Sequence, residues 1–102
     1  RYFGDHQVVV VASGYGAAFR MSRHLVEGQV VVLVRGPEEF EEWYYSLLEP
    51  WRNYVPVFRD PSDDAAFRRD LRETLVKLRY NDQLRADISA GAREFYHTYF
   101  HG

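Results

Sequence analysis

Two short valine-rich runs flank a segment with helical spacing in the first third of the chain. The runs are residues 8–12 and 30–34, and the segment between them is 18–27. Uniformly apolar runs of this length are typical of strands buried in a parallel sheet, and the intervening segment predicts the connecting helix of a βαβ unit. Gly28 follows that helix, where a left-handed C-terminal residue is expected.

A second helix and a third strand are predicted in the middle of the chain. Residues 38–48 follow Pro37, carry acidic residues in the first turn, and stop before Pro50, which favours a helix. The apolar run 54–58 predicts a third strand. Because Pro56 lies inside this run, we expect an edge strand or a bulge.

Two more helices complete the predicted order. Ser62 is the expected N-cap of the first, with Asp63 and Asp64 in its first turn. Asn81 is the expected N-cap of the second, which contains Gly91 at a cost of about 1 kcal/mol relative to alanine. The order β-α-β-α-β-α-α predicts an α/β fold with a short parallel sheet in one domain, residues 1–102. Because three strands make a thin sheet, we expect this domain to be a fragment of a larger fold.

Composition narrows the function classes. The chain has 102 residues and a net charge of -2, so it has no overall basic field, and we expect no nucleic-acid partner. Its apolar runs are too short to span a bilayer, so no transmembrane segment is expected. With no cysteine, the chain has no disulfide, thiolate nucleophile or cysteine metal site.

The turn after the first strand is the strongest candidate for chemistry. Its small residues let backbone N–H groups approach a phosphate, and the following helix adds partial positive charge at its N-terminus. Arg20 lies in the first helical turn, where the dipole disfavours a cation, and this implies a compensating anion. Two alternatives stay open: a packing turn that binds nothing, and a surface arginine paired with Glu27. The candidate phosphate-binding residues are Gly14, Tyr15, Gly16, Ala17, Ala18, Phe19 and Arg20.

Several histidines and acids have a structural interpretation beside a functional one. His24 suits a general base, but no partner acid is visible, so a packed or surface histidine is favoured. His97 and His101 lack the spacing of zinc ligands. Asp60, like Asp63 and Asp64, is interpreted as a capping acid.

Two groups of side chains leave the choice between structure and binding open. The acids at the start of the second helix are expected to cap it and to be solvated, or one of them bonds a ribose hydroxyl. The aromatic cluster is expected in the core, or as a stacking platform for a base or sugar. The acids are Glu38, Glu39, Glu41 and Glu42, and the aromatics are Trp43, Tyr44, Tyr45, Trp51 and Tyr54.

Several segments, spread over nearly the whole chain, point together to one family. They are Gly14-x-x-Ala17-Ala18-Phe19-Arg20, Gly28, Glu42-Trp43-Tyr44-Tyr45, Leu48-x-Pro50-Trp51-x-x-Tyr54-Val55-Pro56-Val57, Asp60 and Asn81-Asp82. In this order and spacing they resemble glycosyltransferase family 90, which includes protein O-glucosyltransferases and O-xylosyltransferases. The Pro-Trp-x-x-Tyr-x-Pro-Val piece is the specific part of the resemblance.

The resemblance implies a GT-B enzyme with two Rossmann-like domains, of which this chain matches the C-terminal, nucleotide-sugar-binding half. The implied donor is a UDP-sugar, whose hexose or pentose passes to a hydroxyl of a protein serine or a glycan. The implied diphosphate site is residues 14–20, the same residues that the small-residue turn and Arg20 predict as a phosphate site. The catalytic base is implied to lie in the N-terminal domain, so no catalytic residue is assigned. No metal or other cofactor is expected, because Arg20 can neutralise the diphosphate and no Asp-x-Asp motif is present.

This chain departs from the family pattern at three positions. Ala18 stands where serine is frequent, and Ser22 and Glu49 stand where lysine is frequent. The alternative function is therefore a degenerate, non-catalytic interaction module derived from the family, and a flavodoxin-like domain is a third possibility. By resemblance, the compartment is the ER or Golgi lumen for a eukaryotic protein, and cytoplasmic or membrane-associated for a bacterial one. Without a partner domain, we expect exposed apolar surface and self-association.

Overall fold

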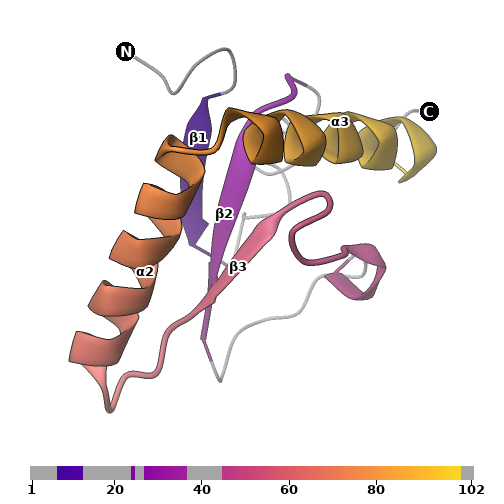
Figure 1. The fold of residues 1–102 in the computed structure, drawn as a ribbon. Helices are drawn as coiled ribbons and strands as arrows, with labels where there is room; N and C mark the ends of the chain where they lie inside the picture. The colour runs from indigo at the N-terminus through magenta and orange to yellow at the C-terminus, as the bar shows by residue number, and fades with distance from the viewer. Residues whose placement is uncertain (1–6, 13–23, 25–26, 37–44, 100–102) are drawn as a thin grey trace.

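A parallel three-stranded sheet forms the centre of the molecule. The computed structural model describes residues 7–12, 24, 27–36 and 45–99. The strands are β1 (Val8–Ala12), β2 (Val30–Arg35) and β3 (Val55–Phe58), in the spatial order β1-β2-β3 (Figure 1). The α/β fold class is therefore confirmed, and each predicted strand is correct to within one residue. The register pairs Val8 with Val30 and Val32 with Val55.

Pro56 lies in an edge strand of the described sheet, as predicted. The N–H of Arg59 donates to the carbonyl of Arg35 at 2.6 Å, which fixes the side of β3 that faces β2. By the two-residue alternation of a strand, the nitrogen of Pro56 points away from β2. The missing N–H of proline therefore removes no hydrogen bond from the sheet.

The described helical elements are η1 (Tyr45–Leu47), a short 3-10 turn, and two long helices, α2 (Asp64–Arg79) and α3 (Asp82–Tyr99). Residue 24 is helical, but most of the predicted helix 18–27, and residues 38–44 of the predicted helix 38–48, lie outside the described residues. Within the part that is described, no helix combines the length and apolarity needed to cross a bilayer.

The N-cap prediction for α2 was wrong by one residue. The carboxylate of Asp63 caps this helix by accepting the N–H of Ala66 at 3.1 Å. The hydroxyl of Ser62 instead donates to Asp60 at 2.8 Å, in the turn that precedes the helix. The N-cap prediction for α3 is confirmed, since the side chain of Asn81 accepts the N–H of Leu84 at 3.0 Å.

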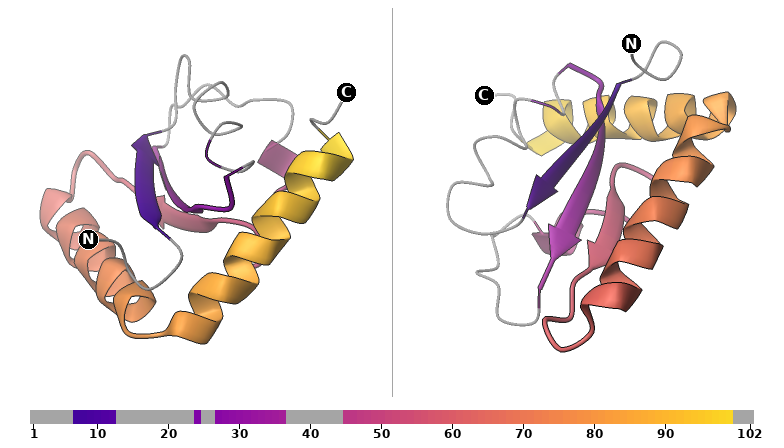
Figure 2. Two further views of the ribbon diagram at one scale, coloured as in Figure 1. Left: turned by 90° about the horizontal axis from the view of Figure 1, so that it is seen from above. Right: turned by 90° about the vertical axis from the view of Figure 1, so that its left-hand side faces the viewer.

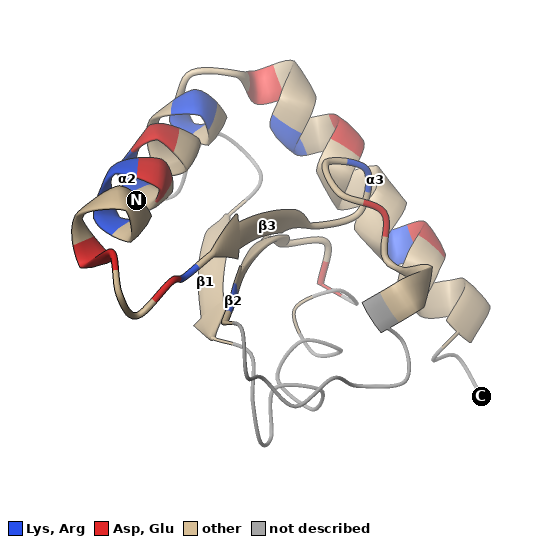
Figure 3. Cartoon of the chain, turned by 90° about the horizontal axis from the view of Figure 1, so that it is seen from below, with Lys and Arg blue, Asp and Glu red and all other residues tan. Residues whose placement is uncertain are grey.

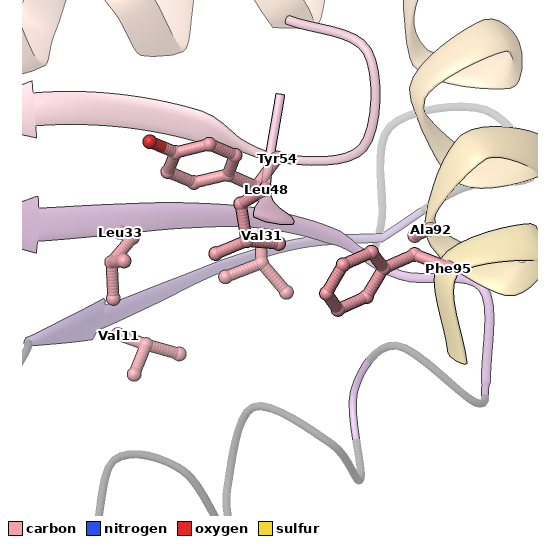
Figure 4. Close-up of a cluster of buried hydrophobic side chains, with 7 residues drawn as sticks. All are labelled: Val11, Val31, Leu33, Leu48, Tyr54, Ala92 and Phe95. Carbon is pink, nitrogen blue, oxygen red and sulfur yellow. The ribbon is translucent and has the colours of Figure 1, made fainter. Parts of the chain in front are cut away.

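Side chains on both faces of the sheet are buried, as two separate clusters. The first joins alternate residues of β1 and β2 to the second half of α3 (Figure 4), and the second joins the opposite face to α2 and the first half of α3 (Figure 2). This two-sided burial explains why the strands are apolar runs rather than alternating patterns. The first cluster is Val11, Val31, Leu33, Leu48, Tyr54, Ala92 and Phe95, and the second is Val30, Val32, Val55, Val57, Leu78 and Ile88.

Helix α3 packs across the amino end of the sheet. The buried hydroxyl of Ser89 donates to the carbonyl of Gly28, just before β2, and Figure 1 shows α3 at the start of the strands. Gly28 has φ +73°, as predicted, and the N–H of Gln29 bonds the carbonyl of His24 at 3.1 Å, which is the pattern of a Schellman cap. The carboxyl ends of the strands lie at the opposite edge.

Candidate functional site

The carboxyl edge of the sheet is the candidate site. Open parallel sheets bind ligands outside the carboxyl ends of their strands. The strand β1 ends at Ala12, which pairs with Val34 of β2, and the predicted phosphate-binding turn follows two residues later. Residues 14–20 themselves, including Arg20, lie outside the described residues, so the structure gives the entry to the turn and not its geometry.

Two arginines at this edge were not predicted as site residues. Arg35 ends β2 and Arg59 follows β3, and their main chains are hydrogen-bonded to each other. Arg35 is half-buried, whereas Arg59 is exposed and holds its guanidinium 5.5 Å from the centre of the Phe67 ring. The signal available in the sequence was an arginine at the end of each of two apolar runs. Both residues add positive charge to the edge where β1 ends.

The N-terminus of α2 also lies at this edge, but its own acids occupy it. Asp63 caps the helix, and the Asp64 carboxylate pairs with Arg68 at 2.8 Å. Figure 3 shows these acids together at the start of α2. A helix N-terminus neutralised in this way is a poor site for an added anion. The turn after β1 therefore stays the better candidate for a phosphate.

Asp60 organises the connection between β3 and α2. Its carboxylate accepts the N–H of Ser62 at 3.0 Å and the hydroxyl of Ser62 at 2.8 Å. The backbone N–H of Ser62, and then its hydroxyl, lower the pKa of Asp60 below its ordinary value. The ionised carboxylate thus stabilises the turn before α2. The capping prediction holds for Asp63 and not for Asp60, whose carboxylate accepts no N–H of the helix among the described residues.

His24 belongs to the opposite edge of the sheet. Its Nδ1 is hydrogen-bonded to the side-chain oxygen of Gln29, and the Gln29 amide donates to the side chain of Gln7 at 3.2 Å. Both glutamines directly precede strands, so this chain of side chains lies at the amino edge, and the structural interpretation of His24 is supported. The exposed His97 packs edge-on against Tyr96, with the two ring centres 5.5 Å apart. The described residues contain no group of three or more acids and histidines suited to a metal ion.

The Pro-Trp-x-x-Tyr-x-Pro-Val motif forms a tight turn and most of β3. Trp51 has φ +65°, which is uncommon for a residue with a side chain, and its N–H donates to the carbonyl of Tyr54 at 2.7 Å. The buried side chain of Asn53 accepts the N–H of Glu49 at 3.0 Å. These bonds close a tight turn that delivers Tyr54 and the following residues of β3 to the core.

The described aromatic residues favour core packing over a binding platform. Tyr54 is only 3% exposed, within the first buried cluster. Trp51 is half-buried and packs against the second cluster. The ammonium nitrogen of Lys77 lies over its ring, 4.6 Å from the ring centre, in a cation–π contact. Trp43 and Tyr44, like His101 and the acids at 38–42, lie outside the described residues, as does the side chain of Tyr45.

Comparison with known proteins indicates the same family as the Pro-Trp-x-x-Tyr-x-Pro-Val motif. The family model described as glycosyl transferase family 90 matches residues 3–101. The O-glucosyltransferase rumi of Drosophila pseudoobscura pseudoobscura is 35% identical over 80% of the chain, and protein O-glucosyltransferase 1 of Rattus norvegicus is 32% identical over the same share. The uncharacterized protein 027R of Frog virus 3 is 39% identical over 87% of the chain. The chain spans only 18%, 19% and 9% of the lengths of these three relatives.

Proposed function

Because the chain belongs to glycosyltransferase family 90, we propose that it forms the donor-binding domain of an enzyme that transfers a sugar from a UDP-sugar to an acceptor hydroxyl. Two of its relatives are named as O-glucosyltransferases, which supports a hexose as the sugar, with a pentose as the related alternative. The acceptor hydroxyl belongs to a protein serine or a glycan.

One observation carries this proposal beyond family membership. The strand β1 ends at Ala12 on the carboxyl edge of a parallel sheet, and residues 14–20 begin there. This is the edge where an open α/β sheet binds its ligand, and in a Rossmann-like domain the turn after a strand contacts the diphosphate. Arg35 and Arg59, at the ends of the neighbouring strands, add positive charge suited to the same ligand.

The proposed chemistry separates this chain's role from that of the acceptor side. The acceptor oxygen attacks the anomeric carbon with inversion, and the bond from that carbon to the diphosphate oxygen breaks. Backbone N–H groups of residues 14–20, the helix N-terminus and Arg20 stabilise the leaving diphosphate, so the step needs no metal. The acceptor proton passes to a base in a separate N-terminal domain of a two-domain GT-B enzyme, and no residue of this chain serves as that base.

A titration of UDP, followed by amide NMR shifts, tests donor binding. We expect saturable shifts that cluster at residues 14–20 and at Arg35, and their loss in Arg20→Ala. Arg23→Ala is the matched control, because it removes the same charge three residues later in the sequence and is expected to leave the shifts in place. Equal shifts in both variants would contradict the assigned site.

The alternative is an interaction module that has lost donor binding. Ala18 and Ser22, where family members often have serine and lysine, favour this alternative. If millimolar UDP causes no amide shift, the interaction module becomes the favoured function. On either reading, the isolated chain is not expected to transfer sugar, so transfer by these 102 residues, measured with radiolabelled UDP-glucose and an acceptor peptide, would refute the division of labour proposed above.

A further inference from the structure

The side of β3 that points away from β2 is an open strand edge. Because the N–H of Arg59 bonds β2, the two-residue alternation turns the carbonyl of Pro56 and both main-chain groups of Phe58 outward. These three groups have no hydrogen-bond partner among the described residues. An unpaired edge of this kind is a template for pairing with another extended chain.

The same edge is already paired one step earlier along the strand. Pro50 forms a parallel bridge with Tyr54, and the N–H of Trp51 donates to the carbonyl of Tyr54 at 2.7 Å. The chain then turns away at Arg52. The edge therefore accepts an extended segment of this chain as far as Tyr54 and is open beyond it.

A groove of about 370 Å³ lies between this open edge and α2. Its volume is within the range of about 300–1,000 Å³ that is usual for ligand sites. Pro56, Val57 and Phe58 form the strand side, and Trp51 also lines the groove. The helix side is a single stripe of α2 with the spacing i, i+3, i+4 and i+7, which consists of Asp70, Glu73, Thr74 and Lys77.

The two acids of this stripe are open to a cationic partner. Glu73 is exposed and has no cation within ion-pair distance in the described part of the chain, and Asp70 meets Arg69 only at 4.0 Å. The ammonium of Lys77 is held over the ring of Trp51 instead, at 4.6 Å. Two carboxylates beside an open strand edge are complementary to a segment that carries lysine or arginine.

We propose that this groove binds an extended peptide that adds to the edge of β3 and alternates basic with apolar residues. Its N–H groups bond the carbonyls of Pro56 and Phe58, and one of its carbonyls accepts the N–H of Phe58. Val57 packs on the α2 face of the sheet, so Phe58, 58% exposed, points to the other face. The basic residues of the peptide therefore lie beside Asp70 and Glu73, and its apolar residues lie beside Phe58.

Binding of a fluorescein-labelled peptide of alternating valine and lysine, followed by anisotropy, tests the charge complementarity. We expect saturable binding that is about fivefold weaker in the double variant Asp70→Asn, Glu73→Gln, as is usual for two exposed ion pairs. The matched control is Asp87→Asn, Glu94→Gln, which removes two exposed acids of α3 outside the groove and should leave the Kd unchanged. No UDP is present, so the result does not depend on the proposed donor site.

Amide hydrogen exchange tests the main-chain pairing. The bound peptide is expected to slow exchange of the Phe58 N–H by about tenfold, whereas the N–H of Arg59, already bonded to Arg35, should change little. Equal binding of a peptide of alternating valine and glutamate, equal weakening in both double variants, or unchanged exchange at Phe58 would overturn the proposal. Slowing at Phe58 that appears without peptide as protein concentration rises would also overturn it, because a second copy of the chain would then be the occupant.

Discussion

The main-chain carbonyl oxygen of Arg52 lies against Gly91, where a Cβ atom would overlap it. Gly91→Ala is therefore expected to lower the free energy of unfolding by about 1–3 kcal/mol through overpacking. Helix propensity alone would predict a gain of about 1 kcal/mol. Urea unfolding followed by circular dichroism distinguishes the two signs. The control is Ala90→Gly at the exposed neighbouring position, which should lose only the propensity contribution.

Gly91 illustrates what the sequence does not reveal. Its cost to an isolated helix is visible from the sequence, but its reason, the close approach of the turn at Arg52, is a tertiary contact. The valine runs predicted the strands well because burial on both sides of a sheet leaves a local pattern. The N-cap of α2 was missed because Ser62 and Asp63 are neighbouring residues that both suit an N-cap, and only the structure shows that Asp63 accepts the helix N–H.

Some candidate site residues could be predicted from the sequence, and others could not. The turn 14–20 was predicted from small residues and an arginine, and the structure places the strand end that leads to it. Arg35 and Arg59 were missed, because only the order and register of the strands bring the ends of β2 and β3 together. The motif containing Trp51 identified the family while serving the fold.

Arg85 and Asp82 form an ion pair whose two partners should differ in importance. The guanidinium is 1% exposed and donates to the carbonyls of Leu78 and Arg79, which end α2, whereas the Asp82 side chain is 87% exposed. Arg85→Met leaves those carbonyls without this donor and should cost about 2–4 kcal/mol of stability. Asp82→Asn should cost less than about 1 kcal/mol, because its carboxylate is solvated. Equal losses in urea unfolding would contradict this asymmetry.

The titration of Asp60 depends on Ser62. Because the folded-state pKa of Asp60 is lowered, its contribution to stability is present above the unfolded value of about 3.9 and is lost as pH falls through the folded value. Ser62→Ala removes the hydroxyl and keeps the backbone N–H, which is the larger cause. We expect the pKa to rise only part of the way, as measured by carboxyl NMR titration. Ser46→Ala, at an exposed position in η1, should leave it unchanged.

Self-association of the isolated chain follows from its exposed apolar side chains. Scattered exposed residues are ordinary, but Val10 in β1 and Val76 in α2, at 47% and 48% exposure, are aliphatic side chains that could pack against another molecule. We expect a weight-average mass that rises between micromolar and near-millimolar concentration in sedimentation velocity, together with binding of a hydrophobic dye. Replacing both valines by lysine should reduce association and dye binding, because the charges oppose burial of these two positions. Arg69→Lys, at an exposed charged position of α2, is the control and should change neither measurement. A chain that stays monomeric and binds no dye would contradict this prediction.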